Sequence, residues 1–148
     1  MQALQFKSYE FRFKSNENNR LIFDEIRKKF VVLTPEEWVR QHVVRFLISE
    51  KKYPKSHINV EKQLLLHGTK KRYDVVVFNS EGSVHLIVEC KAPSVPITQT
   101  TFDQIARYNL VADATYLMVT NGLAHYYCTL NYERERYDFL KELPEYQS

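Results

Sequence analysis

The sequence predicts a mixed α/β (α+β) domain in which α-helices flank a central mixed β-sheet. A capped amphipathic segment lies at 34–50, and two apolar strand-like runs separated by a turn lie at 72–91. A second helical pattern at 98–111 leads into another predicted hairpin. The length of 148 residues fits a single domain spanning 1–148.

The N-terminal extension is assigned to residues 1–30. Residues 1–19 alternate weakly between apolar and polar side chains and end in a polar run, which indicates a short strand pair or an arm. Residues 21–30 place apolar side chains near helical spacing. Either a short helix or an irregular segment fits that pattern.

The predicted core, 31–130, opens with strong helix-start signals. Thr34 can cap a helix, Pro35 suits its first position, and two glutamates follow in the first turn, where the helix dipole favours negative charge. Apolar residues at i, i+4, i+7 and i+8 then form one stripe, namely Val39, Val43, Phe46 and Leu47.

Strand patterns fill most of the remaining core. The turn sequences Asn79-Ser80-Glu81-Gly82 and Asn121-Gly122 each separate two apolar runs and predict hairpins. The tail at 131–148 is charged and aromatic, and one more strand is expected near 137–140. The core strands are expected at 58–67, 72–78, 84–91, 115–120 and 123–130.

Net charge, cysteines, histidines and apolar runs limit the classes of protein to which the chain can belong. The net charge of +3 is too small to establish a nucleic-acid partner, because basic clusters are common on solvated surfaces. Cys90 and Cys128 lie in apolar runs and read as reduced core residues. The five histidines lack the spacing of a zinc site. We expect a cytoplasmic protein without a membrane span, since no leader or long apolar run is present.

One group of polar residues interrupts the apolar strands. Glu89 and Lys91 are two apart and should project from the same face, with Cys90 turned to the other. Asp74 lies near the start of the preceding strand. Because the hairpin makes these strands antiparallel, the start of one meets the end of the other, so Asp74, Glu89 and Lys91 are expected to converge.

Such a group suits phosphodiester chemistry. Two close carboxylates bind a hard cation such as Mg²⁺ or Mn²⁺. The metal neutralises a phosphodiester and lowers the pKa of a water, and a nearby lysine stabilises developing charge. The alternative is a surface salt bridge between Glu89 and Lys91. That alternative is disfavoured because a bare carboxylate at the end of a buried strand costs free energy unless it is paired or metal-bound.

These residues resemble the PD-(D/E)xK nuclease superfamily, and more closely the N-terminal nuclease domain of type I restriction enzyme R subunits. The resemblance covers about residues 30–130 and implies a restriction-endonuclease-like core. The usual proline before the first acid is replaced by Tyr73. The segments that carry the resemblance are TPEEWVRQ (34–41), YDVVVF (73–78), LIVECKAP (86–93), FDQIARYN (102–109) and VTNG (119–122).

The resemblance implies a role for each matched residue. Asp74 and Glu89 would hold the metal, and Lys91 would be the catalytic lysine. A glutamate at the start of the first helix would join the metal ligands. Glu36 and Glu37 both fit, with Glu37 narrowly favoured by the family's glutamate-rich helix start.

A further set of residues is expected at the DNA. Gln104 and Tyr108 match a Q-x-x-x-Y pattern, and their spacing of four places them on one helix face. The resemblance implies that this helix supports the site and contacts DNA, with Gln104 also counted among the catalytic residues. The basic run Lys70, Lys71 and Arg72 is a further candidate DNA contact.

The chain departs from a type I R subunit in one respect. Its three glycines, Gly68, Gly82 and Gly122, cannot form the G-x-x-x-x-G-K-[ST] phosphate loop of an ATP-driven motor. We expect a metal-dependent deoxyribonuclease domain, whose partners would be DNA, other restriction-system subunits or a second copy of the chain. The alternative is a catalytically inactive nuclease-fold module that binds DNA or a protein.

Overall fold

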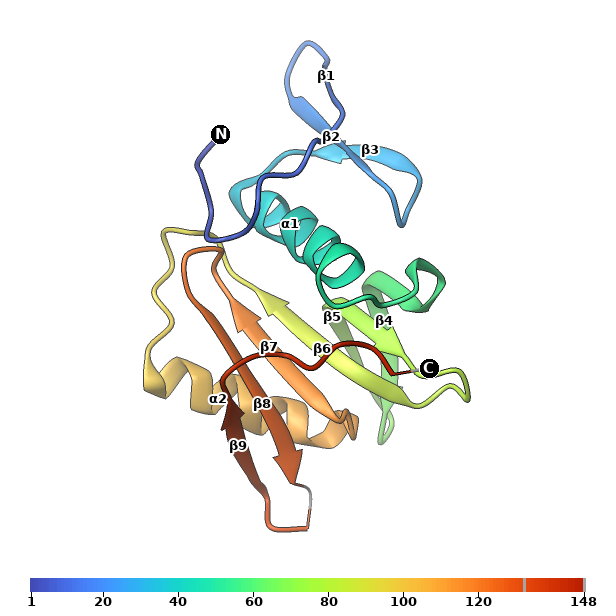
Figure 1. Cartoon of the computed structure of the whole chain (residues 1–148), viewed down its shortest axis with the longest axis vertical. Helices are drawn as coiled ribbons and strands as arrows, with labels where there is room; N and C mark the ends of the chain where they lie inside the picture. Colours follow the sequence, from blue (N-terminus) through green and yellow to red (C-terminus); the bar gives the residue numbers. More distant parts are fainter. Residues whose placement is uncertain (132, 148) are drawn as a thin grey trace.

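A computed structural model describes residues 1–131 and 133–147 of the chain. Six strands form the main sheet in the order β4-β5-β6-β7-β8-β9, and three more form a small antiparallel sheet, β1-β2-β3 (Figure 1). Neighbouring main-sheet strands are antiparallel except β6 and β7, which are parallel. The predicted mixed sheet with flanking helices is therefore confirmed.

The main-sheet strands follow the expected runs closely. The predicted strand near 137–140 is present as the edge strand β9, so the tail belongs to the main sheet. The strands are β4 (Ile58–Leu66), β5 (Thr69–Phe78), β6 (Val84–Cys90), β7 (Tyr116–Thr120), β8 (His125–Asn131) and β9 (Arg136–Leu140).

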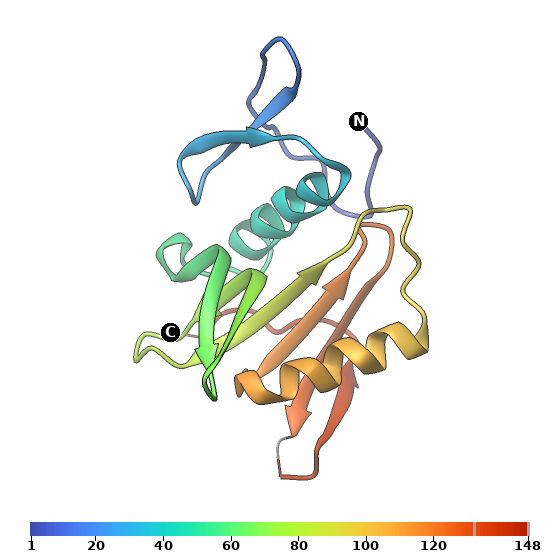
Figure 2. The same cartoon turned by 180° about the vertical axis from the view of Figure 1, so that it is seen from behind.

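The two α-helices cover opposite faces of this sheet (Figures 1 and 2). Helix α1 (Pro35–Ser49) has Thr34 as its N-cap, with the Thr34 Oγ1 accepting the Glu37 N–H at 3.0 Å. Helix α2 (Gln99–Asn109) lies in the connection between the parallel strands β6 and β7. Two short 3-10 helices, η1 (Lys55–His57) and η2 (Leu110–Ala112), complete the main domain. Among the described residues, no helix has the length and apolar character needed to cross a membrane.

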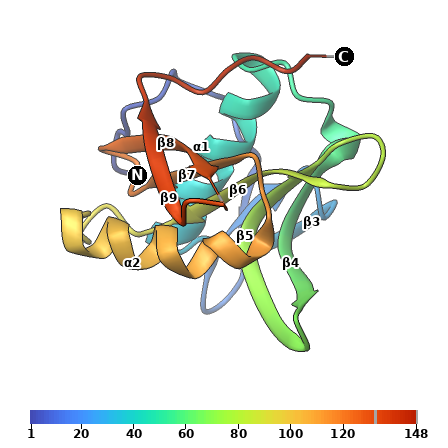
Figure 3. The ribbon, with the colours of Figure 1, turned by 90° about the horizontal axis from the view of Figure 1, so that it is seen from below.

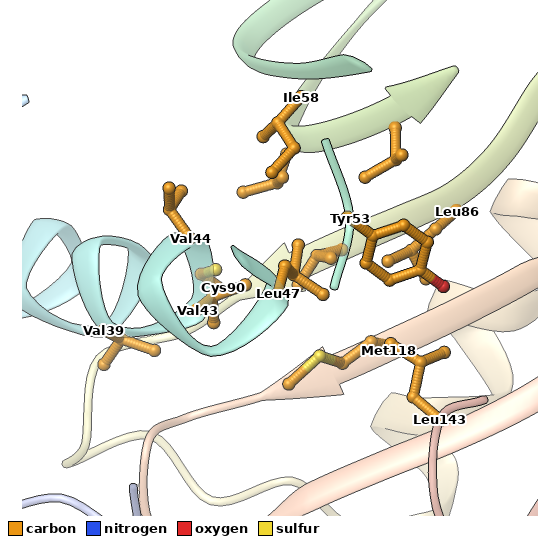
Figure 4. Close-up of a cluster of buried hydrophobic side chains, with 13 residues drawn as sticks. Val39, Val43, Val44, Leu47, Tyr53, Ile58, Leu86, Cys90, Met118 and Leu143 are labelled. Carbon is orange, nitrogen blue, oxygen red and sulfur yellow. The ribbon is translucent and has the colours of Figure 1, made fainter. Parts of the chain in front are cut away.

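Each helix seals one hydrophobic core. On the α1 side, the apolar stripe of the helix packs against the sheet and against Leu143 of the C-terminal segment (Figure 4). On the α2 side, Phe102 and Ala106 pack against the other face of the sheet. Fully burying such side chains contributes about 1.5–3 kcal/mol each. The sheet is thus buried on both faces at its centre.

The N-terminal extension contains a structure that differs from the prediction. Residues 21–30 form neither a helix nor an irregular segment. They contribute to a hairpin made of β2 (Arg20–Asp24) and β3 (Lys29–Val32), to which β1 (Phe13–Ser15) adds. The physical reason is a period of two: Ile22 and Asp24 are buried while their neighbours are partly exposed. Strand β3 crosses the expected boundary between residues 30 and 31.

An arm precedes this small sheet and is tied to the main domain. Trp38 Nε1 donates to the Gln2 carbonyl at 2.8 Å, and the Gln5 N–H donates to the Gly122 carbonyl at 2.8 Å. Gly122 has φ +86°, and a Cβ there would lie 2.9 Å from a Leu4 methyl group. Glycine therefore permits both the turn and the close approach of the arm.

Candidate active site

The site forms where β5 and β6 separate. Their backbone pairing runs from Phe78 and Val84 to Val75 and Val88, and no further pair follows. Beyond that point the Asp74 carboxylate replaces the backbone link, since its Oδ2 accepts the Cys90 N–H at 2.8 Å. The two acids predicted to converge are thereby held beside each other.

The alternation along β5 breaks at Asp74. Val75 and Val77 pack in the α1-side core and Val76 in the α2-side core, as a period of two requires. Tyr73 also packs in the α2-side core, although strict alternation along the strand would place it on the face of Val75. The neighbouring strand is irregular at the same level: Glu61 has φ +50° and lies between the pairs Val60↔Val75 and Lys62↔Tyr73.

The alternation along β6 is regular. Cys90 packs in the α1-side core with Leu86 and Val88, as expected. Glu89 and Lys91 line one cavity of about 390 Å³ on the other side, so their predicted projection from a common face is confirmed. The Lys91 N–H also donates to the Thr120 carbonyl at 2.8 Å, which extends the β6–β7 pairing by one residue.

The same cavity gathers several predicted DNA-contacting residues. Arg72, Gln104 and Tyr108 line it together with Glu89 and Lys91. Helix α2 presents Gln104 and Tyr108 on one face, and the β4–β5 hairpin projects beside that helix (Figures 2 and 3).

Lys70 and Lys71, the other two residues of the basic run, lie outside the cavity lining. Lys71 is tied to α2: its Nζ donates to the Tyr108 carbonyl at 3.0 Å and lies 3.5 Å from the centroid of the Tyr108 ring. Lys70 is exposed near the hairpin tip, opposite Leu65. The structure therefore brings Arg72 to the acids and leaves Lys70 remote from them.

The two glutamates at the start of α1 have different environments. The buried Glu37 carboxylate accepts hydrogen bonds from Arg27 Nη2 at 3.0 Å, Arg40 Nε at 3.0 Å and Gln41 Nε2 at 2.9 Å. Burial alone would raise the pKa of Glu37, but the bonds from Arg40 and Gln41 and the two arginine charges hold it below its usual value. Both Glu37 oxygens are thus already satisfied.

Glu36 instead interacts with the predicted acids. Burial and then the negative charge of Asp74 raise the pKa of Glu36, while Arg40 and Lys91 lower it. The charge of Glu36 also contributes to raising the pKa of Glu89. The structure therefore places Glu36 within electrostatic range of the Asp74 and Glu89 pair and commits Glu37 to an ion-pair network.

Sequence reasoning missed Arg40, a buried cation next to the site. Its Nη1 lies 3.5 Å from Asp74 Oδ1, and its Nη2 lies 3.3 Å from Glu61 Oε1 in addition to its bonds with Glu37. The one available signal is that Arg40 follows Glu37 by three residues on a helix, the spacing of a salt-bridged pair.

The carboxylates of Asp74 and Glu89 repel each other when both are ionised. Burial, followed by the negative charge of Asp74, raises the pKa of Glu89 to about 7, against a lowering effect of Lys91. Burial also raises the pKa of Asp74, although the Cys90 N–H and the charges of Arg40 and Lys91 oppose it. A bound proton or cation relieves this repulsion.

The donor chemistry of the pair suits a hard divalent cation. Across residues 1–131 and 133–147, no group of three or more Asp, Glu, His or Cys side chains is arranged to hold a metal ion. Asp74 and Glu89 supply two carboxylates, and Mg²⁺ is commonly held by one or two carboxylates, waters and substrate phosphates. The pair fits this mode of binding.

Two unpartnered polar atoms adjoin the cavity. Among the described residues, the buried Tyr73 hydroxyl and Asn109 Oδ1 have no hydrogen-bond partner. Asn109 lines the cavity, and burial, followed by the charges of Tyr108 and Glu89, raises the pKa of Tyr73 to about 12. No sequence pattern marks either residue as part of the site.

Comparison with known proteins identifies the family of the chain. The family model described as type I restriction enzyme R protein N terminus matches residues 35–144, which include α1, the whole main sheet and α2. A comparison with curated proteins gave no match. Because the match spans most of the sequence, the chain belongs to the family of type I restriction enzyme R protein N-terminal domains.

Proposed function

We propose that the protein is a Mg²⁺- or Mn²⁺-dependent deoxyribonuclease. The observation that carries this proposal is the pair of half-buried carboxylates, Asp74 and Glu89, held side by side where β5 and β6 separate, with Lys91 on the same face as Glu89. Membership of a restriction enzyme family supports DNA as the substrate.

Each residue has a role that follows from its position. Asp74 and Glu89 would hold the metal, which when bound would polarise the phosphodiester and lower the pKa of a water. The Lys91 ammonium would stabilise negative charge on the phosphate. Of the two glutamates at the start of α1, we assign Glu36 rather than Glu37 an electrostatic role beside the Asp74 and Glu89 pair, because the oxygens of Glu37 are bonded to Arg27, Arg40 and Gln41.

The cavity beside Glu89 would receive the DNA strand that is cut. Its lining includes the Arg72 guanidinium for a phosphate oxygen, the Gln104 amide and the Tyr108 ring. Lys71 would join these contacts from its position against Tyr108. Lys70, exposed near the hairpin tip, would reach a more distant phosphate.

A second candidate function rests on Arg40. Its guanidinium lies 3.5 Å from Asp74 and already offsets part of the charge that a metal would neutralise. This contact favours a nuclease-fold module that binds DNA, or another subunit of a restriction system, without cutting.

A cleavage assay with supercoiled plasmid DNA tests the proposal. We expect nicking with Mg²⁺ or Mn²⁺, none with a chelator, and loss of nicking in Asp74→Asn. Glu10→Gln, which removes an exposed carboxylate of the arm, is the matched control and should cut normally. Absence of cleavage, or equal cleavage by Asp74→Asn, would refute the nuclease proposal. DNA binding without cleavage would support the second candidate.

A further inference from the structure

The positive charge of the chain is concentrated in its N-terminal segment. Residues 1–34 contain seven Lys or Arg and four Asp or Glu, whereas residues 35–148 contain 14 of each kind. The segment therefore carries the entire net charge of +3. It also lies outside the part of the chain that matches the family model, 35–144.

The small sheet sorts these residues onto two faces. Ile22 and Asp24 are buried on the inner face. Strand register places the opposite residues in rows on the outer face, since paired residues share a face. One row is Lys14, Leu21 and Val32, and the next is Arg12, Phe23 and Phe30. We call these six residues the outer face.

The outer face carries cations stacked on aromatic rings. Arg12 Cζ lies 4.6 Å from the centroid of the Phe23 ring, and Lys14 Nζ lies 4.6 Å from that of the Phe30 ring. Within residues 1–131 and 133–147, neither Arg12 nor Lys14 forms a salt bridge. Both side chains are exposed, so their charges are available to an anionic partner.

Hollows adjoin the outer face at both ends. A cavity of about 600 Å³ is lined by Val32 of the outer face and by Glu36 beside the candidate active site. A second cavity, of about 380 Å³, combines four cations with one acid, and its lining is Arg12, Phe23, Glu25, Lys28, Arg45 and Lys55. The outer face thus lies between a mainly acidic hollow near the site and a hollow with an excess of cations, in which Glu25 pairs with Arg45 and Lys55.

We propose that the outer face docks the phosphate backbone of DNA at a distance from the cleavage site. Two neighbouring exposed cations, one in each row and each above an aromatic ring, suit a polyanion whose sugars and phosphates alternate. The inference relies on the proposed function only in taking DNA as the ligand. DNA bound at the candidate active site would continue past the hollow beside Glu36, and the outer face would bind that flanking part of the DNA.

The salt dependence of DNA binding tests this assignment. The double variant Arg12→Gln with Lys14→Gln is compared with Arg134→Gln with Lys141→Gln, which removes the same charge from two exposed positions of the main domain, one in the β8–β9 turn and one just after β9. Affinity for a labelled duplex is measured by fluorescence anisotropy over a range of salt concentrations, with a chelator present to prevent cleavage.

We expect the first double variant to bind more weakly and with a shallower salt dependence. Losing two phosphate contacts should lower the slope of log K against log salt concentration by about 2. The control variant should keep the wild-type slope and affinity. The single variant Lys14→Gln, at an exposed position, should show about half of that change in slope, which guards against misfolding of the double variant. Wild-type slopes in Lys14→Gln and in a folded double variant would overturn the proposal, as would an equal loss in the control.

Failure of docking and failure of catalysis give different results. Glu89→Gln should abolish cleavage and leave the salt slope unchanged. The Arg12 and Lys14 double variant should still cut when protein is saturating. If the wild-type protein cuts no DNA but the double variant still lowers the slope, the docking assignment stands and the nuclease proposal fails.

Discussion

Replacing Glu89 with glutamine should stabilise the metal-free protein at neutral pH. Burial and the charge of Asp74 raise the pKa of Glu89 from 4.5 to about 7. The folded protein therefore holds a proton on Glu89 in a pH range where the unfolded chain has released it. The stability that this proton provides is complete below about pH 4.5 and is lost as the pH rises through about 7.

The size of the effect follows from the difference between the folded and unfolded pKa. A tenfold change in a proton-binding constant is worth about 1.4 kcal/mol, so the full loss is about 3 kcal/mol. Most of this loss falls between pH 5 and 8. A glutamine at position 89 keeps a neutral group throughout and removes the titration.

Urea denaturation in the presence of a chelator measures the effect. The free energy of unfolding of Glu89→Gln should exceed that of the wild type by an amount that grows by about 2–3 kcal/mol from pH 5 to pH 8. Glu10→Gln, at an exposed position, should show no such growth. A constant difference between Glu89→Gln and the wild type would refute our account of the paired carboxylates.

Three further outcomes are expected. Lys91→Ala should lower the cleavage rate by about 10²–10³-fold and leave metal binding intact, as measured by calorimetry; unchanged cleavage would remove Lys91 from the mechanism. Glu37→Gln should lower the free energy of unfolding, measured by urea denaturation, by about 3 kcal/mol, because it breaks a buried ion-pair network. Glu36→Gln, at an exposed position, should change the free energy of unfolding by less than about 0.5 kcal/mol. Equal costs would contradict the two environments. Gly122→Ala should lower the free energy of unfolding by about 1–3 kcal/mol, because position 122 has a positive φ and lies close to Leu4. It should also speed amide hydrogen exchange in the arm, and unchanged exchange would mean that the close approach of Leu4 to Gly122 does not hold the arm.

Strand β6 could be predicted at the site because it obeys a period of two from Leu86 to Cys90. The apolar run that ends in Glu89, Cys90 and Lys91 determines which side chain enters the core, and the structure agrees. A hairpin with a recognisable turn then brings Asp74 opposite Glu89. Local patterns were sufficient wherever pairing is local and regular.

Two features near the site depend on contacts that are distant in the sequence. Glu37 is distinguished from Glu36 in part by Arg27, which reaches Glu37 from the N-terminal extension at 3.0 Å. No helical pattern contains that information. The orientation of Tyr73 depends on the irregular backbone at Glu61 on the neighbouring strand. Both cases required the tertiary structure.

The prediction for residues 21–30 was wrong for another reason. Its apolar residues fit helical spacing by chance, while alternation was obscured because Phe23 and Phe30 are apolar on the outer face. An aromatic residue stacked beneath an arginine, as Phe23 is beneath Arg12, reads in the sequence as a core residue.

Calorimetric titration of the protein with Mn²⁺ tests the central claim most directly, because it needs no substrate. We expect the wild-type protein to bind the metal, Glu89→Gln and Asp74→Asn to lose most of this affinity, and a folded Glu37→Gln to retain it. Equal metal binding by the wild type and Glu89→Gln, or no binding by the wild type, would contradict a metal site built on the Asp74 and Glu89 pair.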